Sequence, residues 1–282
     1  MLELTSASLD GLSPSEKRVG RLAAEKPRQF ALMSTSQIAS ACMVSNPTVV
    51  RFCRSLGYDG IAQFKLKLLK DRDSGVSFVH ASVEPNDSPA NVALKILDNS
   101  IASLALFRSY VPKAAIERAS DALAQAHHDQ RGVAFYGSGH SGVVAGDAQL
   151  RFTRLGFSSV ACCDGYSQVV NASARREGDI VVATSSSGRT KELLDAVDVA
   201  RRRGASVIAL TGTGTPLASL GSVHIATDHL EDFERFMPTS SRLLHLVVVD
   251  ILATAVALKV GAEPLRYQLE QTQRLLRHRR YA

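Results

Sequence analysis

The sequence of 282 residues contains no tryptophan, and only 6% of its residues are aromatic. This scarcity excludes a sugar-binding surface built from stacked aromatic rings. The cysteines form no C-x-x-C pair and have no histidines at the spacing of metal ligands, so we expect reduced thiols and no metal site. The cysteines are Cys42, Cys53, Cys162 and Cys163.

Long uninterrupted apolar runs are also missing. The N-terminal segment has no apolar region typical of a signal peptide. The longest apolar stretch, 243–260, contains His245, Asp250 and Lys259, which favours a buried helix over a membrane span. We therefore expect a cytoplasmic protein with no membrane partner.

Positive charge is concentrated in the first quarter of the chain. The net charge is +6, and residues 1–75 contribute +4 of it, from eleven Lys and Arg against seven Asp and Glu. A basic segment suits a polyanionic partner, although a solvated surface gives the same count.

The pattern of apolar residues divides the chain into three segments. Residues 1–75 have apolar residues three and four apart, which predicts helices throughout. Residues 76–90 are rich in turn formers and are predicted to be a linker. Residues 91–282 alternate short apolar runs with amphipathic stretches, which predicts a parallel sheet with helices on both faces.

The elements expected in the third segment can be placed individually. Five strands are predicted in GVAFYG, SSVACCD, DIVVATS, SVIALTG and SVHIATD, and helices at 91–109, 113–127, 241–260 and 264–280.

The spacing within 35–57 predicts a helix-turn-helix. Thr35 is the expected N-cap of its first helix, and Met43 lies in the turn, where glycine is common. Ser45 or Asn46 is expected to cap the second helix, with Val49 and Phe52 facing the core.

The opposite face of that second helix carries side chains suited to a DNA groove. Arginine can pair with guanine and asparagine with adenine, while lysines further along suit phosphates. A structural three-helix bundle with a charged surface remains the alternative. The residues predicted to contact DNA are Thr35, Ser45, Asn46, Thr48, Arg51, Arg54 and Lys65.

Two strand ends carry glycine- and hydroxyl-rich loops that suit an anion. GVAFYG leads into Gly137-Ser138-Gly139-His140-Ser141, and DIVVATS into Ser185-Ser186-Ser187-Gly188-Arg189-Thr190. Ligands of open parallel sheets bind beyond the carboxyl ends of strands, where helix N-termini offer N–H donors. A dinucleotide site or simple helix caps are the alternatives.

These segments resemble the RpiR family of bacterial regulators, which join a helix-turn-helix to a sugar isomerase (SIS) domain. The similarity lies in SNPTVVRFCRSLGYDGIAQFKLKL, YGSGHS, SSSGRTKE and ALTGTGTPLA, and it covers about residues 12–262. The resemblance implies an all-α helix-turn-helix domain at 1–75 and an α/β SIS domain at 91–282. The second domain would have a three-layer structure, a parallel five-stranded sheet flanked by helices.

The resemblance also implies roles for the loop residues. Ser185, Ser187 and Thr190 would hold a phosphate, and Ser138 and Ser141 would contact the sugar or its phosphate. Arg189 or Arg242 could hold a second anion, such as a carboxylate. Gly137, Gly139 and Gly188 complete the predicted phosphosugar site, and no cofactor is expected.

A sensor is expected rather than an enzyme. None of His140, His224, His229, Glu231, Asp232, Glu234 and His245 has a spacing that demands acid–base catalysis.

The resemblance extends to repressors of hexose catabolism that respond to 2-keto-3-deoxy-6-phosphogluconate. It implies a homodimer or homotetramer that binds operator DNA, is released by that sugar acid phosphate, and associates through 91–109 and 241–260. An SIS isomerase, an activator of the same family and a structural dimerising protein remain alternatives.

Overall fold

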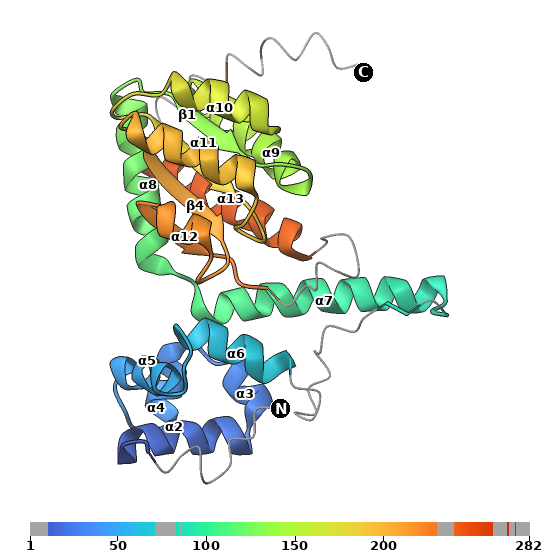
Figure 1. Cartoon of the computed structure of the whole chain (residues 1–282). Coiled ribbons are helices and arrows are strands. Elements are labelled where there is room, and N and C mark those ends of the chain that lie inside the picture. Colours follow the sequence, from blue (N-terminus) through green and yellow to red (C-terminus); the bar gives the residue numbers. More distant parts are fainter. Residues whose placement is uncertain are drawn as a thin grey trace. The chain divides into compact units, whose positions relative to one another are not determined.

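The structure is a computed structural model that describes residues 11–70, 83–84, 86–229, 240–261, 270 and 274 (Figure 1). The chain divides into two compact units. One comprises 1–111 with 228–244, and the other comprises 112–227 with 245–282. Most of the predicted linker and of the predicted helix at 264–280 lie outside the described residues.

The regular structure described in the first unit is helical, as the apolar spacing predicts. Two of its helices begin with capping boxes, in which Ser13 pairs with Glu16 and Ser34 with Gln37. The N-cap at the second of these is therefore Ser34, and the prediction of Thr35 was wrong by one residue. The helices are α2 (Pro14–Glu25), α3 (Pro27–Leu32), α4 (Thr35–Ala41), α5 (Asn46–Ser55), α6 (Ile61–Lys70) and α7 (Pro89–Tyr110).

Aromatic rings hold the helix-turn-helix on its neighbours. Val49 and Phe52 of α5 are fully buried, as predicted. Phe64 of α6 meets Phe30, Phe52 and Tyr58 edge to face, at centroid distances of 5.7, 5.2 and 5.4 Å. Edge-to-face pairs of this kind add to the stabilisation that comes from apolar burial, and they orient α5 on α6.

The turn between α4 and α5 has the backbone geometry of a glycine although the residue is Met43. Its φ is 51°, in the left-handed region, which costs a side-chain-bearing residue about 1–2 kcal/mol. Arg18 stabilises the turn by donating to the carbonyls of Cys42 at 2.9 Å and Met43 at 3.1 Å. The left-handed conformation at residue 43 therefore persists without glycine.

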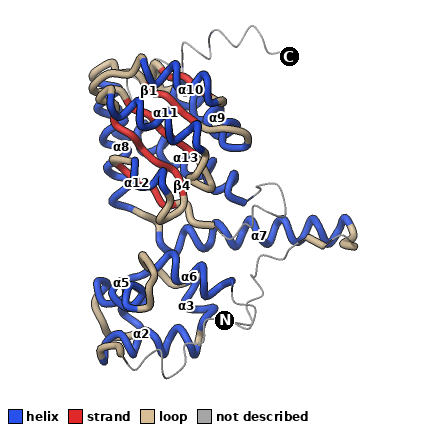
Figure 2. The backbone as a smooth tube through the Cα atoms, in the orientation of Figure 1, coloured by secondary structure: helices blue, strands red, loops and turns tan. Residues whose placement is uncertain are grey.

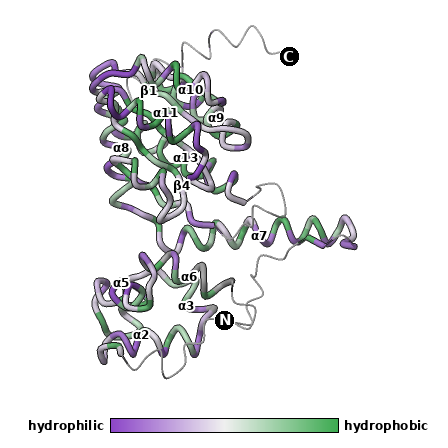
Figure 3. The backbone as a smooth tube through the Cα atoms, viewed as in Figure 1, coloured by the Kyte–Doolittle hydropathy of each residue, from purple (hydrophilic) through white to green (hydrophobic). Residues whose placement is uncertain are grey.

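Helix α7 is the long helix of the first unit. It has 22 residues, and the Ser88 hydroxyl caps it by accepting from the Asn91 N–H at 3.2 Å. Apolar residues are spread along much of its length (Figure 3). By length and composition alone, α7 and α13 (Ser240–Val260) could each cross a membrane, a test that the core helices of soluble proteins also pass.

The second unit is a parallel five-stranded sheet with helices on both faces (Figure 2). All five strands lie where the sequence predicts them, and α13 runs from the first unit into the second at residue 245. The other elements of the second unit are α8 (Lys113–His128), β1 (Val133–Tyr136), α9 (His140–Arg154), β2 (Ser159–Cys162), α10 (Gly165–Ser173), β3 (Ile180–Thr184), α11 (Lys191–Arg202), β4 (Ser206–Thr211), α12 (Pro216–Leu220) and β5 (Val223–Ala226).

The strand order is β2-β1-β3-β4-β5, and every pairing is parallel. Alternate residues of β1 face opposite layers: Tyr136 belongs to the apolar cluster that includes Leu193 of α11, whereas Phe135 contacts Phe152 of α9 with ring centroids 5.1 Å apart. Both central strands, β1 and β3, are buried along their whole length. The predicted three-layer architecture is thus confirmed.

Candidate functional site

The strand order creates a switch point between β1 and β3. The connection from β1 leads to β2 on one side of the sheet, and the chain after β3 leads to β4 on the other. Loops at such a point leave in opposite directions and open a crevice at the carboxyl ends of the strands, where open α/β sheets bind ligands. The two predicted loops follow these two adjacent strands.

The first loop, 137–141, depends on glycine. A Cβ at Gly137 would lie 2.3 Å from the Ser141 carbonyl oxygen, and Gly139 has a φ of 57°. Gly139 is also the N-cap of α9 and offers no side chain to the N–H groups of the first turn. The positive end of this 15-residue helix is therefore left without a side-chain cap, which favours an anion.

In the second loop, 185–190, serine hydroxyls accept hydrogen bonds from the backbone. The Ser185 hydroxyl accepts from the Gly188 N–H at 3.0 Å, and the Ser187 hydroxyl accepts from the Arg189 N–H at 3.3 Å. Each hydroxyl keeps its own proton for donation. Thr190 is the N-cap of α11, and its side chain makes no capping hydrogen bond. The loop thus offers hydroxyl donors beside a helix N-terminus.

A third loop, after β4, packs directly on the second, and none of the predicted site residues lies in it. The Leu217 N–H donates to the Gly188 carbonyl at 3.2 Å, and the hydroxyls of Thr211 and Thr215 lie 3.2 Å apart. A Cβ at Gly188 would lie 2.5 Å from the first of these hydroxyls and 2.4 Å from the second. In the sequence, this loop could have been recognised from the three threonines of T-G-T-G-T at the end of a buried strand.

The two candidate arginines lie in different compact units, Arg189 in the second and Arg242 in the first. Arg189 is exposed at the end of the second loop, and Arg242 is half-buried near the start of α13. Of the two arginines, Arg189 is the one that is exposed and follows the loop serines in the chain.

Two of the four candidate histidines, His224 and His245, pair with neighbours in the second unit. The His224 Nε2 lies 3.0 Å from the Thr211 carbonyl, and the buried His245 Nε2 lies 2.9 Å from the Thr227 hydroxyl. Glu231, Asp232 and Glu234 lie outside the described residues. Among the described residues, no group of three His, Cys, Asp or Glu could hold a metal ion.

The groove-facing surface of α5 is smaller than predicted. Asn46, Arg51 and Arg54 are exposed, as is the N-cap Ser45. Thr48 is only 5% exposed; its hydroxyl lies 2.9 Å from that of Ser45 and accepts from Arg51 at 3.3 Å. The prediction that Thr48 faces outward was wrong. Its buried hydroxyl instead supports the Arg51 side chain through a hydrogen bond.

Lys65 was predicted to contact DNA, and this prediction was wrong, because its side chain is fully buried. Its ammonium donates to the Met33 carbonyl and, at 3.0 Å, to the Ser109 hydroxyl of α7. Burial lowers the pKa of Lys65 to about 8. This side chain ties α6 to α7 inside the first unit.

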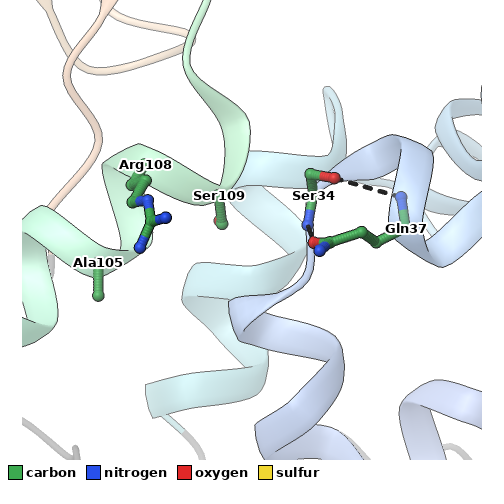
Figure 4. Close-up of a pocket in the computed structure, with 5 residues that line it drawn as sticks. All are labelled: Ser34, Gln37, Ala105, Arg108 and Ser109. Carbon is green, nitrogen blue, oxygen red and sulfur yellow. Dashed lines mark hydrogen bonds between the residues drawn. The ribbon is translucent and has the colours of Figure 1, made fainter.

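The first unit also contains a cavity of about 530 Å³ between α4 and α7 (Figure 4). Ser34 and Gln37 line it from α4, and Ala105, Arg108 and Ser109 line it from α7. The two α4 side chains already pair with each other's backbone N–H groups in the capping box. None of the predicted phosphosugar residues lines this cavity.

A helix-turn-helix joined to an α/β unit with hydroxyl-rich loops at its switch point defines a class of transcriptional regulators that combine DNA binding with a small-ligand domain. The chain belongs to the RpiR family of these regulators. A helix-turn-helix domain of the rpiR family matches residues 1–75, and a SIS domain matches residues 128–255.

Relatives named as regulators are similar over nearly the whole chain. The HTH-type transcriptional regulator HexR of Pseudomonas aeruginosa is 37% identical over 284 residues, 96% of this chain and 98% of that protein. HexR of Escherichia coli is 37% identical over 281 residues, 100% of this chain and 96% of that protein. The similarity to these two named regulators thus extends over both the helix-turn-helix domain and the SIS domain.

Longer relatives contain the same region. The bifunctional protein glk of Burkholderia pseudomallei is 41% identical over 253 residues, which are 90% of this chain. The chain spans only 39% of the length of that protein.

Solved structures share the fold. The Vibrio vulnificus NanR protein complexed with ManNAc-6P is 22% identical, with a TM-score of 0.59 and coverage of 99% of this chain and 98% of that one. The sugar isomerase domain of an RpiR transcription factor from Sphaerobacter thermophilus is 21% identical, with a TM-score of 0.54, and covers 66% of this chain and 98% of that domain.

Proposed function

We propose that the protein is a cytoplasmic repressor of sugar catabolism genes whose operator binding is released by a phosphorylated sugar acid such as 2-keto-3-deoxy-6-phosphogluconate. The observation that carries the proposal is the pair of uncapped helix N-termini, α9 and α11, at the β1/β3 switch point. Both follow loops whose hydroxyls and glycines suit a phosphate. The choice of effector rests on the resemblance of the sequence motifs to repressors of hexose catabolism.

The proposed phosphate contacts are Ser185, Ser187 and Thr190, with Ser138 and Ser141 from the first loop. Neutral hydroxyls suit an effector that must dissociate as its concentration falls, because no buried cation has to be desolvated for binding. Arg189, exposed beside them, supplies a guanidinium for the carboxylate of a sugar acid.

The proposed active species is a homodimer, or a homotetramer built from such dimers. Helix α7 carries four exposed large apolar side chains within eight residues: Leu94 (60% exposed), Ile96 (39%), Leu97 (58%) and Ile101 (54%). Only Lys95 and Asp98 are charged between residues 90 and 107. Because α7 shares a compact unit with the helix-turn-helix, pairing two α7 helices would bring together two recognition helices for a palindromic operator.

The effector can be tested with a ligand panel scored by thermal unfolding. The panel contains 2-keto-3-deoxy-6-phosphogluconate, glucose 6-phosphate, N-acetylmuramic acid 6-phosphate and inorganic phosphate. We expect the first to raise the Tm by about 5 °C at 100 times its Kd, since binding to the native state alone adds about 2.7 kcal/mol. The same compound should weaken binding to an operator selected from random DNA by the chain itself.

The possible results separate the candidate functions. No shift with any phosphosugar would contradict ligand sensing. Turnover of a sugar phosphate would favour the isomerase, and tighter operator binding with ligand would favour an activator.

The DNA-reading surface can be tested at Arg51 and Arg54. Replacing either with alanine should lower operator affinity about 10- to 100-fold, the effect of losing a bidentate contact worth about 1–3 kcal/mol. Fluorescence anisotropy at fixed salt measures the change. Arg201→Ala, which removes an exposed arginine at the end of α11, is the matched control and should bind normally. Equal losses in all three variants would indicate a general charge effect.

A further inference from the structure

Gln168 lies at the carboxyl ends of β1 and β2 without any exposure to solvent. It comes from α10, which packs beside α11 (Figure 1). Its Nε2 lies 3.1 Å from the Gly137 carbonyl, 3.1 Å from the Cys162 carbonyl and 3.3 Å from the Ser138 hydroxyl. One side chain therefore contacts both the strand ends and the first loop of the proposed phosphosugar site.

The surroundings fix which way the amide points. Two carbonyl oxygens can only accept, so the atom that faces them is the NH₂ group. The Ser138 hydroxyl is a third neighbour of the same NH₂ group, which shares its two protons among these oxygens. Because an amide nitrogen cannot accept, the Ser138 oxygen is the acceptor in this contact. Because the Ser138 hydroxyl accepts on the side that faces Gln168, its own proton points away from the amide. Ser138 can therefore donate that proton to another group.

The other end of the amide is unpaired. Gln168 Oε1 is buried and has no hydrogen-bond partner in the described part of the chain. A buried acceptor without a partner is destabilising. What the amide contributes at this position is therefore its pair of N–H donors, which an apolar side chain of the same size would lack.

We propose that Gln168 is a positioning residue of the phosphosugar site, which directs the Ser138 proton away from the amide and toward an acceptor oxygen of the ligand, such as a phosphate oxygen. This inference rests on the proposed function, because it names a residue that orients the same site.

The Gln168→Glu variant tests the inference because a carboxylate of the same shape cannot donate. The carboxylate would face two carbonyl oxygens, and the Ser138 hydroxyl would be free to turn its proton toward the carboxylate. We expect its Kd for 2-keto-3-deoxy-6-phosphogluconate to rise at least about tenfold at pH 8, the effect of misdirecting one hydrogen bond to a charged group. At pH 6 the introduced carboxyl, whose pKa burial among carbonyls raises, should regain a proton and recover much of the affinity.

Gln149→Glu is the matched control. Gln149 of α9 also ties a helix to β2, but its Oε1 accepts from the Ala161 N–H at 3.1 Å. A carboxylate keeps that bond, so this variant should bind as the unsubstituted chain does at both pH values.

The pH comparison is made as a ratio to the unsubstituted chain, which removes the titration of the ligand phosphate and of every group that the variants share. Three nearby groups have pKa values that are shifted away from this interval. Hydrogen bonds from Ser167 lower the pKa of Asp164, and burial raises those of Cys162 and Tyr136. Glu192 of α11, which meets α10 at Gly165, stays the same in every variant.

A second variant, Gln168→Met, keeps the inference testable if the first does not fold. It removes both donors and should bind about tenfold more weakly at pH 6 and pH 8 alike. Unchanged affinity in Gln168→Met, or an equal loss for Gln168→Glu at both pH values, would overturn the inference. If the unsubstituted chain binds no phosphosugar by calorimetry, the proposed function itself fails, which is a separate and recognisable result.

Discussion

The Gly188→Ala variant is expected to bind its operator normally and to lose its response to the phosphosugar. The position has a φ of 61°, and a Cβ would lie 2.4–2.5 Å from the hydroxyls of Thr215 and Thr211. The methyl group must push the second and third loops apart, which separates the hydroxyls that surround the anion. Losing one or two hydrogen bonds to a charged group, at about 1.5–3 kcal/mol each, corresponds to a Kd at least about 100-fold higher.

Calorimetry with 2-keto-3-deoxy-6-phosphogluconate and operator release measured by anisotropy check this expectation. The control is Gly261→Ala, in the same compact unit. Gly261 also has a left-handed φ, 98°, but a Cβ there would meet nothing within 4 Å. This control carries the backbone strain without the collision and should keep its ligand response. A normal response in Gly188→Ala would show that the packing of these two loops is not needed for binding.

Introducing acids on α7, as Leu97→Glu with Ile101→Glu, is expected to convert the proposed dimer to a monomer and to weaken operator binding at least about 100-fold. The two side chains are 58% and 54% exposed in a single chain. Burying a leucine or isoleucine against a partner contributes about 1.5–3 kcal/mol, and a symmetric interface counts each residue twice. A monomer also loses the gain in affinity from two linked half-sites.

Light scattering after size exclusion gives the oligomeric state, and anisotropy gives the operator affinity. The paired control is Leu97→Met with Ile101→Leu, which keeps both positions apolar and should remain dimeric. If the acidic variant stays dimeric and binds the operator normally, α7 is not the interface and another surface must join the copies.

The sheet was predictable because its central strands, β1 and β3, are buried along their whole length. The apolar runs that become β1 and β3 are bounded by glycine and by loop hydroxyls, and they are short enough to exclude helices. The strand order does not follow from these runs alone. It brings the loops after β1 and β3 to neighbouring positions and thereby supports the grouping of Ser138 with Ser185, which rested on chain order and resemblance.

Side chains whose environment depends on a distant element were less predictable. Lys65 reads as a surface residue in FKLKLLK, but α7, whose Ser109 lies 44 positions away in the sequence, covers it. Thr48 has the right residue type for a groove, yet the turn before α5 draws its hydroxyl toward Ser45. Gln168 gives no signal in the sequence, because its importance arises only where α10 meets the ends of two strands.

The Lys65–Ser109 contact has a mechanical consequence. It anchors α6 to the C-terminal end of α7, so the helix-turn-helix and α7 are expected to move together. A helix of 22 residues is about 33 Å long, and a tilt of about 10° at one end moves the other by about 6 Å. Half-sites one turn of DNA apart are separated by about 34–36 Å, so a displacement of that size spoils the fit to both grooves. In the proposed dimer, a change of about 10° in the angle between the two α7 helices would therefore be enough for the effector to release the operator.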